Sequence, residues 1–448
     1  MENKFEHQYC YELQREKKNF IIKIRNHIKY RNSIEYYKLK EIWIINDRRD
    51  KAADNGEFFF RYLRMKKPKG IKAYFAIEKN SDDFKRLQKI GNIIDLNSKR
   101  YKIIALKTNK IISSVSDNWV CNPLNNAQKY IRDLLNFEII FLQNGIIKDD
   151  LSKYLNKFDK NFNLFVTSSK REYKSILEYK YGYNKNNVVL TGMPRFDNLL
   201  NLKNKIGQKK KIIIMPTWRI NIQGSIDLIP SKLKHSEIFI YTKFFKFYNY
   251  LINDERLLLI MKQNNYTGTL CLHQFFETQW IDFKQNEIFS ILEKCDYQKL
   301  LLEGSLLITD YSSIFFDFGF LRKPVIYTHF DYEEYRNTHY KQGYFNYYLD
   351  GFGPICKDIN CAVNEIIFEI ENNCFLRQKF LERINNFFEF SDKNNSERIF
   401  HEIIKTKSKT TIKYRNSKFF YFVFVSVFLL CIKMIKRLKK INEFIIYI

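Results

Sequence analysis

The stretch from Leu306 to Thr328 constrains the fold of this chain more than any other, because it has the pattern of one strand–helix–strand unit. Leu306-Leu307-Ile308 is a short apolar run of the length expected for a buried strand. A helical apolar pattern begins at Ile314, and Pro324–Thr328 is predicted to be a second strand. Two parallel strands joined by a helix form a βαβ unit, so the sequence predicts an α/β fold.

The turn between the first strand and the helix carries Asp310, Ser312 and Ser313. Serine side chains commonly cap a helix by accepting hydrogen bonds from its first N–H groups. Those N–H groups, with the positive end of the helix dipole, also attract anions. In open α/β sheets, ligands bind at the carboxyl ends of the strands, where this turn lies. Two interpretations follow: the serines only cap the helix, or they also hold a phosphate.

The same alternation of strands and helices recurs along the 448-residue chain, whose 45% hydrophobic content is typical of a globular protein. Helices are predicted at 58–65, at 170–179, at 238–260 and from about 360 to 404. This order is typical of doubly wound parallel sheets. The further strands that we expect are Glu41–Asn46, Ala73–Ile77, Ile103–Leu106, Lys110–Val115, Glu138–Leu142, Leu164–Thr167, Val188–Leu190, Lys211–Met215, Gly268–Leu272 and Ile288–Leu292.

A polar and basic stretch, Leu202–Lys211, interrupts this alternation and is the best candidate for a linker. A new α/β series begins after it. We therefore expect two Rossmann-like domains, at 41–203 and 204–404, with a ligand site between them. A helical segment is predicted before them at 1–40, and a separate tail after them at 405–448.

The formal net charge of +27 favours contact with phosphates, nucleic acid or an anionic membrane, unless it only reflects a Lys- and Asn-rich composition. No zinc-finger spacing, RNP-like motif or basic-region heptad occurs, so specific nucleic-acid recognition is not expected. The eight cysteines form no CxxC pair and no zinc-type group. We therefore expect reduced, mostly buried thiols in a cytoplasmic protein. The charged N-terminus has no apolar core of a secretory signal.

The tail combines basic and apolar residues. No Asp or Glu occurs between Lys405 and Lys440, and the run Phe419–Ile432 is apolar. That run is shorter than the roughly 20 residues that cross a bilayer. Basic residues on both flanks favour an element that lies on an anionic membrane surface. A helix packed on the protein and a true membrane span are the alternatives.

Motifs of several ligand-binding classes do not occur in the sequence. It has no GxGxxG, no Walker A motif, no GxSxG and no DxD pair. Dinucleotide sites, P-loops, hydrolase elbows and a metal-held diphosphate are therefore disfavoured. An α/β protein that binds a diphosphate without a metal neutralises its charge with Arg, Lys, His and helix N-termini. We accordingly expect no bound metal and no cofactor.

Side chains of this kind follow four predicted strands. They are Arg195, the pair Thr217 and Arg219, His273, and the two serines at 312 and 313. Each is a weak signal by itself, since a lone histidine or arginine is more often structural. Because the carboxyl ends of successive parallel strands meet at one crevice, we expect these residues to converge.

Several segments then carry a resemblance. In chain order they are WIINDRRDKAADNGE, FLQNGIIKDDLSKYLNK, TGMPRFDNLL, IIIMPTWR, LCLH and LLITDYSSIFFDFGFLRKPVIYTHFDYEEY. Together they resemble the CDP-glycerol glycerophosphotransferase family, whose members build teichoic acids and related capsular polymers of glycerol or ribitol phosphate. The resemblance implies a GT-B-like fold, with an acceptor-side first domain and a second domain that binds the CDP donor. It also implies transfer of glycerol phosphate from CDP-glycerol to an acceptor hydroxyl, with release of CMP.

The resemblance also implies roles for residues of the second domain. His273 matches the histidine of an LHP-like motif and is expected to donate to a diphosphate oxygen, although Gln274 replaces the usual proline. Ser312 and Ser313 match the DYSS serines and are expected to hold phosphate. Asp310 is expected to orient that loop.

The MPTWR and GMPRFD turns, which are also specific to the family, supply three further residues. Arg219, with Thr217 beside it, matches the TWR arginine and is a candidate phosphate contact. For Arg195, a phosphate contact and an ion pair with Asp197 or another neighbour are equal alternatives.

The chain departs from the family at Asn144, which precedes Gly145 in a turn that relatives write LQHG or WHG. That histidine is the favoured general base, and an asparagine cannot accept a proton. Three outcomes stay open. Asp149 or Asp150 could serve as the base, the acceptor could need little help, or the chain could be a slow or inactive paralogue.

The predicted partners are a CDP-polyol donor, a lipid-linked polymer or glycan acceptor, and an anionic membrane surface contacted through 405–448. These partners place the chain at the cytoplasmic face of the cell membrane. One alternative is a GT-B glycosyltransferase that uses a nucleotide sugar. The other is a non-catalytic scaffold of capsule assembly that binds nucleotide or polymer.

Overall fold

The computed structural model describes residues 15, 19, 41–105, 107–123, 137–178, 180–223, 235–292 and 295–406. The helical segment predicted at 1–40 and the tail predicted at 405–448 lie almost wholly outside these ranges. The chain divides into two compact units, and both sheets belong to the first of them, Met1–Ile403.

The first domain contains a sheet of seven parallel strands in the order β3-β2-β1-β4-β5-β6-β7. The order reverses between β1 (Glu41–Asn46) and β4 (Lys110–Ser113), which makes their carboxyl ends the topological switch point. Ile44 and Ile45 of β1 are fully buried although they point to opposite faces, as expected for a parallel strand covered on both sides. The other strands are β2 (Ile71–Ile77), β3 (Ile93–Asp95), β5 (Glu138–Phe141), β6 (Leu164–Thr167) and β7 (Val188–Leu190).

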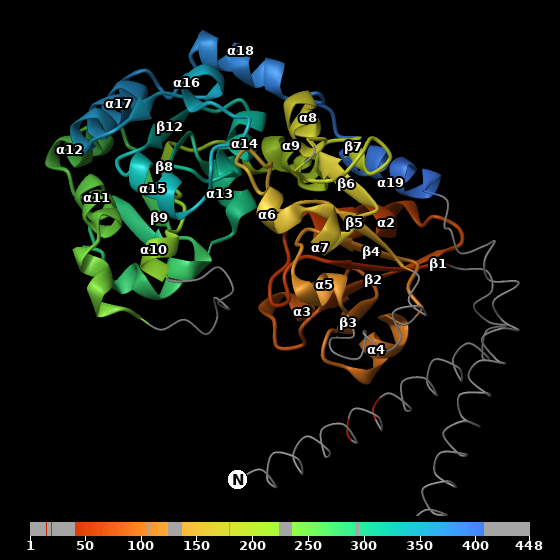
Figure 1. Cartoon of the computed structure of the whole chain (residues 1–448). Coiled ribbons are helices and arrows are strands. Elements are labelled where there is room, and N and C mark those ends of the chain that lie inside the picture. Colours follow the sequence, from red (N-terminus) through yellow and green to blue (C-terminus); the bar gives the residue numbers. More distant parts are fainter. Residues whose placement is uncertain are drawn as a thin grey trace, which may run out of the picture. The chain divides into compact units, whose positions relative to one another are not determined.

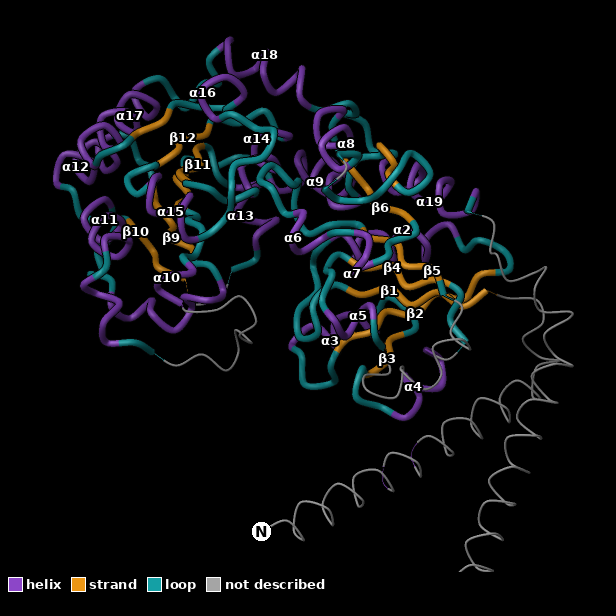
Figure 2. Tube along the Cα trace, in the orientation of Figure 1, coloured by secondary structure: helices purple, strands orange, loops and turns teal. Residues whose placement is uncertain are grey.

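The second domain has a sheet of six parallel strands in the order β10-β9-β8-β11-β12-β13. Its switch point lies between β8 (Lys211–Ile214) and β11 (Leu306–Thr309), where Ile213 pairs with Leu307. Figure 2 shows the strands of each sheet lying together between helices. The prediction of two Rossmann-like, doubly wound domains is confirmed. The remaining strands are β9 (Thr267–Cys271), β10 (Phe289–Leu292), β12 (Val325–Thr328) and β13 (Ile355–Cys356).

Helices flank both sheets (Figure 1), and several of them begin at a capping side chain. The Asp54 side chain, for example, accepts a hydrogen bond at the start of α2 (Asn55–Lys66), which ends at Lys67 in the left-handed region. The other helices of the first domain are α3 (Asp82–Gln88), α4 (Lys99–Ala105), α5 (Asn118–Cys121), α6 (Ser152–Leu155), α7 (Lys157–Lys160), α8 (Lys170–Ile176) and α9 (Pro194–Ile206).

The second domain carries α helices and two 3-10 helices, which are labelled η. Within the described residues they are α10 (Ile220–Gln223), η5 (Glu237–Tyr241), α11 (Lys243–Leu251), α12 (Glu255–Gln263), η6 (Gln274–Asp282), α13 (Tyr297–Glu303), α14 (Ile314–Phe320), α15 (Tyr332–Thr338), α16 (Tyr347–Asp350), α17 (Ile359–Glu371) and α18 (Gln378–Phe387). The last described helix is α19 (Asn395–Lys405).

One predicted strand was wrong. Residues 103–105, predicted as part of a strand, end helix α4, where Ile104 and Ala105 pack in the first-domain core. The helical region predicted at 238–260 is confirmed, and it consists of three separate elements because Thr242 and Asp254 cap new helices within it. Short apolar runs give little information about period, and capping residues inside a run are easily overlooked. The short strands β3 and β13 were not predicted.

The predicted linker begins inside a helix. Helix α9 extends to Ile206 and packs on both α2 and α13, and only the residues from Gly207 to 210 lie between it and β8. Gly207 has a φ of 73°, which a glycine adopts readily at the end of a helix.

Helix α19 returns to the first sheet although it lies at the end of the range predicted for the second domain. Ile399 and Ile403 are buried in the same core cluster as Trp43. The rings of Trp43 and Phe400 lie 6.0 Å apart. Figure 1 shows α19 beside elements of the first domain. The predicted second domain therefore contributes its last helix to the first.

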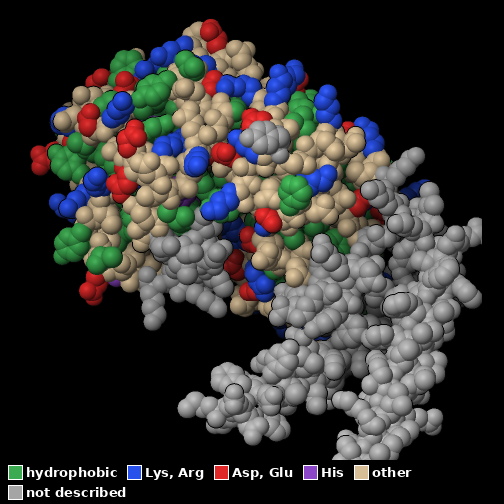
Figure 3. Space-filling model, in the orientation of Figure 1, with side chains coloured by type: hydrophobic (Ala, Val, Ile, Leu, Met, Phe, Trp, Pro, Cys, Tyr) green, Lys and Arg blue, Asp and Glu red, His purple; other side chains and the backbone are tan. Residues whose placement is uncertain are grey.

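Among the residues described by the structure, no helix is long and apolar enough to cross a membrane. On the face seen in Figure 3, Lys and Arg side chains are interspersed with acidic and hydrophobic ones. This face therefore gathers no large patch of a single charge.

Candidate active site

Two loops meet at the switch point of the second sheet, 215–219 after β8 and 310–313 after β11. Asp310 joins them, because its fully buried carboxylate accepts hydrogen bonds from the backbone N–H of Thr217 (2.8 Å) and of Tyr311 (2.6 Å). Through these bonds Asp310 joins the two loops, and its predicted role at a ligand site stays a prediction.

Arg219 is buried beneath the same loops. Its Nη2 donates to Asp310 (2.8 Å) and its Nε to Asp331 (2.7 Å), while Nη1 donates to the carbonyl oxygen of Thr217 (2.6 Å). The guanidinium also lies over the rings of Tyr311 and Tyr335, at 5.0 and 5.2 Å. Each of the three guanidinium nitrogens of Arg219 thus donates a hydrogen bond to an oxygen of the protein. The geometry gives it a positioning role, and its predicted contact with phosphate stays a prediction.

The two serines differ in their local bonding. The Ser312 hydroxyl accepts the N–H of Ile314 (3.3 Å) and so caps α14, whereas Ser313 occupies the N-cap position without a capping hydrogen bond. Both are half-buried. A Cβ added to Gly145 would lie 2.3 Å from the Ser313 hydroxyl oxygen, so a larger residue here would force the Ser313 side chain to move. The first domain therefore reaches Ser313 through the turn that contains Gly145.

Asn144 precedes that glycine and is exposed at the carboxyl end of β5. Within the described ranges, no residue hydrogen-bonds to its side chain. Its backbone is held firmly instead, because Arg195 donates to the Asn144 carbonyl oxygen (2.6 Å) and Asn55 to that of Gln143 (2.7 Å). Gln143 has a φ of 64°, so the turn presents Asn144 in a fixed position.

Arg195 forms ion pairs with Asp317 (2.8 Å) and Asp54 (2.9 Å). Of the two alternatives predicted for Arg195, the structure contains an ion pair. The partner is not Asp197, which accepts the backbone N–H groups of Asn395 and Ser396 in α19.

Asp149 and Asp150, the acids predicted as substitute bases, are both engaged. Asp149 is buried between Lys148 and Arg336, the latter at 2.5 Å, and these cations lower its pKa although burial raises it. Asp150 accepts the N–H of Ser152 and pairs with Lys180 at 3.1 Å, and its pKa is also lowered. A carboxylate with a lowered pKa is a weak base at neutral pH, so neither acid is well suited to replace the missing histidine.

His273 follows β9 and is half-exposed. Its Nδ1 accepts the N–H of Phe275 (3.3 Å), and its ring lies 6.1 Å from that of Trp218 in the 215–219 loop. Burial, followed by Arg48, His339 and Lys51, lowers the pKa of His273 well below its usual value. The imidazole is therefore neutral, with its proton on Nε2 because Nδ1 is an acceptor. A neutral Nε2–H is a hydrogen-bond donor, and the predicted donation of His273 to a diphosphate oxygen stays a prediction.

His339 was not predicted from the sequence. Its ring lies 4.6 Å from Trp218, on which His273 also stacks, and its Nδ1 accepts the N–H of Ile220 (3.3 Å). Burial and then Arg219 lower the pKa of His339 to about 3. Its Nε2 is buried with no hydrogen-bond partner among the described residues. Because His339 comes at the end of α15 and not after a strand, the strand-end rule could not find it.

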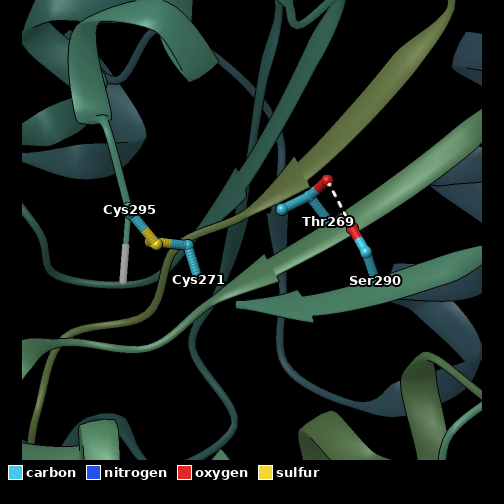
Figure 4. The surroundings of a disulfide bond; sticks show 4 residues. All are labelled: Thr269, Cys271, Ser290 and Cys295. Carbon is cyan, nitrogen blue, oxygen red and sulfur yellow. Dashed lines mark hydrogen bonds between the residues drawn. A yellow bond between two sulfur atoms is a disulfide. The ribbon is translucent and has the colours of Figure 1, made fainter. Parts of the chain in front are cut away.

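A disulfide joins Cys271 to Cys295, and Cys271 comes two residues before His273 in the chain (Figure 4). It joins the end of β9 to the residues before α13, next to the hydrogen bond between Thr269 and Ser290 (3.1 Å). The expectation that all cysteines are reduced thiols was therefore wrong for this pair. Among the other described cysteines, Cys356, Cys361 and Cys374 are free thiols.

Within the described part of the chain, no group of three or more His, Cys, Asp and Glu side chains could hold a metal ion. The loops at the strand ends of the second sheet carry hydroxyls, backbone N–H groups and an imidazole. Ser313, in one of these loops, lies against Gly145 of the first domain.

The two parallel-sheet domains and the loops at their strand ends define a GT-B-like α/β protein. The family described as CDP-Glycerol:Poly(glycerophosphate) glycerophosphotransferase matches residues 25–405, so the chain belongs to this family. The resemblance seen in the sequence motifs is confirmed.

The relatives work on teichoic acids, as their names state. The chain is 40% identical over 378 residues to the minor teichoic acid biosynthesis protein GgaB of Bacillus subtilis (strain 168). This match covers 84% of this chain and 41% of GgaB. It is 26% identical over 271 residues to the teichoic acid poly(ribitol-phosphate) polymerase of Bacillus spizizenii, with coverages of 56% and 38%. The chain thus spans about two fifths of the length of these curated relatives.

Among solved structures, the wall teichoic acid polymerase TagF is similar to the chain with a TM-score of 0.59. The sequence identity is 17%, and the match covers 86% of this chain and 97% of that one. At this identity the likeness concerns the fold alone.

Proposed function

We propose that this chain transfers glycerol phosphate, or a similar polyol phosphate, from a CDP-linked donor to a hydroxyl of a teichoic-acid-like or capsular polymer. The observation that carries the proposal is the joining of three loops at the ends of β8, β9 and β11. Asp310 ties 310–313 to 215–219, and Trp218 stacks on His273. Ser313 at the same place lies against Gly145 of the first domain.

In the proposed reaction, the acceptor hydroxyl oxygen attacks the phosphorus that bears the polyol. A new P–O bond forms, the bond to the CMP phosphate breaks, and CMP leaves with the negative charge. This chemistry depends mainly on positioning and on stabilising the phosphoryl oxygens. His273 supplies a neutral N–H donor, and Ser312 and Ser313 supply hydroxyls. No metal or cofactor is part of this proposal.

The hydroxyl proton is the weak point of the mechanism. Asn144 cannot accept it, and Asp149 and Asp150 are held by cations. General-base catalysis typically contributes about 10²- to 10⁴-fold to a rate. We therefore propose a slow transferase, and this observation also favours a second candidate: a family member that binds donor or polymer without turnover.

The test is the release of CMP from CDP-glycerol in the presence of a lipid-linked or membrane acceptor. The purified wild type should release CMP, and His273→Ala should abolish that release because a phosphate donor is lost. His235→Ala is the matched control, since this exposed histidine pairs with Asp282 at 2.8 Å. Equal rates for the wild type and His273→Ala would contradict the proposal. CDP-ribitol and a panel of nucleotide sugars identify the donor and test the glycosyltransferase alternative.

We further propose that residues 405–448 bring the chain to the cytoplasmic face of the cell membrane, where a lipid-linked acceptor would lie. The basic and apolar sequence of this tail supports the proposal. Flotation with anionic liposomes should recover the full chain but not a chain that ends at residue 404. Equal flotation of both would rule out the tail as the anchor.

A further inference from the structure

The loop 47–54 of the first domain follows β1 at the switch point and carries Arg48 and Lys51. Its backbone is fixed along its length. The Lys51 carbonyl accepts the N–H of Arg48 (3.1 Å), and the N–H of Ala52 donates to Asp83 (2.8 Å). Further bonds join the Arg49 carbonyl to the N–H of Glu78 (2.8 Å) and the Asp50 carbonyl to the Ser81 hydroxyl (2.7 Å). The two cations are therefore held in place by a rigid loop.

Both cations lie close to the second domain. The Lys51 ammonium is 5.0 Å from the ring centre of Tyr297 in α13. Tyr297 comes two residues after Cys295, and Cys271, the disulfide partner of Cys295, comes two residues before His273. The Lys51 ammonium and the His273 imidazole therefore lie in the same region of the molecule. The direction of the pKa shift of His273 agrees, because after burial Arg48, His339 and Lys51 are the groups that lower it.

These two cations lack the close carboxylate partner that their neighbour has. Arg49, between them in the chain, pairs with Glu78 at 2.7 Å. Of the residues that the structure describes, none forms an ion pair with Arg48 or Lys51. Burial lowers the pKa of Lys51, Glu277 nearby opposes this, and Arg48 adds to the lowering. Two half-buried like charges side by side would both be stabilised by an anion that hydrogen-bonds to them.

We propose that Arg48 and Lys51 form the first-domain half of a phosphate-binding site whose second-domain half is His273. The site takes a phosphate group because a planar guanidinium, an ammonium and a neutral N–H all donate, and phosphate oxygens only accept. The phosphate comes either from the diphosphate of the donor or from a phosphodiester of the acceptor polymer. The choice between these two sources rests on the proposed function, whereas the site itself does not.

The experiment measures binding and needs no turnover. The full chain and the variants Arg48→Gln, Lys51→Gln and Arg48→Lys are titrated calorimetrically with inorganic pyrophosphate, CDP and a short glycerol-phosphate oligomer at low ionic strength. Arg49→Gln is the matched control, because its charge is already satisfied by Glu78. Thermal unfolding of each variant verifies that it is folded.

We expect each Gln variant to bind pyrophosphate about 10- to 100-fold more weakly, the range for one lost charge-assisted hydrogen bond. Arg48→Lys should recover part of the affinity, and Arg49→Gln should bind like the wild type. Parallel weakening of CDP binding assigns the site to the donor, and weakening of oligomer binding assigns it to the acceptor. No weakening for any probe, or no pyrophosphate binding by the wild type, overturns the proposal. If these effects occur but CMP is never released from CDP-glycerol, the proposed function fails and the phosphate site stands.

Discussion

The two switch points each hold a fully buried aspartate, but the two carboxylates have different partners. Asp310 in the second domain faces Arg219 at 2.8 Å as well as two backbone N–H groups. Asp47 in the first domain accepts the N–H groups of Gly56 (2.7 Å) and Glu57 (3.1 Å) and a bond from the Ser114 hydroxyl. No cation among the described residues pairs with Asp47.

The two domains therefore differ in whether the buried aspartate at the switch point is neutralised by a cation. In the second domain, the buried ion pair between Asp310 and Arg219 fixes the loops that carry Thr217 and the serines. In the first domain, burial and the neighbouring Asp54 raise the pKa of Asp47 to about 7. Asn144, on the same side, has no basic group to offer. The loops of the second domain are therefore fixed by a buried ion pair, whereas the buried carboxylate of the first domain has no cation beside it among the described residues.

Asn144→His adds a basic group to the first domain, and it is the variant with the largest expected effect. An imidazole placed on the exposed turn next to Gly145 supplies the missing base, so CMP release should rise by about 10²- to 10⁴-fold. Steady-state rates with CDP-glycerol and a lipid-linked acceptor measure the change. An unchanged rate would show that proton removal does not limit CMP release, and that the first domain does not lack a needed base.

Arg219→Met tests the buried ion pair of the second domain. Methionine leaves Asp310 and Asp331 buried without their cation, which should lower the free energy of unfolding by about 3–5 kcal/mol. Urea unfolding measures this loss. Arg256→Met removes an exposed arginine paired with Asp254 and should leave the midpoint nearly unchanged. Similar midpoints for both variants would mean that the buried pair is not what fixes the loops.

Gly145→Ala tests the contact between Gly145 of the first domain and Ser313 of the second domain. The added methyl group would lie 2.3 Å from the Ser313 hydroxyl oxygen, so we expect a loss of about 1–3 kcal/mol in the free energy of unfolding. Ser313→Ala in the same chain removes the clashing oxygen and should restore part of it. Additive losses in this double-mutant cycle would show that the turn does not press on Ser313.

Asp47→Asn tests the unpaired carboxylate and has the smallest expected effect. Because the folded-state pKa of Asp47 is raised from 3.8 to about 7, the folded protein binds the extra proton between these values. Its contribution to stability is present below this window and is lost as the pH rises through about 7. Between pH 6 and 8 this loss amounts to about 1 kcal/mol. Urea midpoints at the two pH values should differ less in Asp47→Asn than in the wild type, and an equal difference would contradict the raised pKa.

Local pattern predicted the elements that carry the site. The strands β1, β6 and β7 have the predicted bounds, and β8, β9 and β11 differ from theirs by a residue. Apolar runs bounded by polar turns are properties of the sequence itself, so their positions could be found without the fold. The strand-end rule then predicted that the loops after β8, β9 and β11 converge. Applied equally to β1, the same rule would have found Arg48 and Lys51.

Long-range partners could not be predicted in this way. Cys271 and Cys295 are 24 residues apart in the chain, and only the fold brings their Cα atoms to 6.4 Å. Arg195 meets Asp317 across 122 residues, and Arg219 meets Asp331 across 112. Sequence spacing carries no information about such pairs, because they depend on which surfaces the sheets bring together.

The sequence by itself determined the family, the two parallel sheets, the motif loops and the replacement of a histidine by Asn144. The tertiary structure decided how the charged residues are used. It placed Arg195 and Arg219 in buried ion pairs and engaged Asp149 with Lys148 and Arg336. It also placed the Lys51 ammonium 5.0 Å from the ring centre of Tyr297. The physical reason is that apolar periodicity is local, whereas the state of a charged group depends on distances in space and on the water excluded around it.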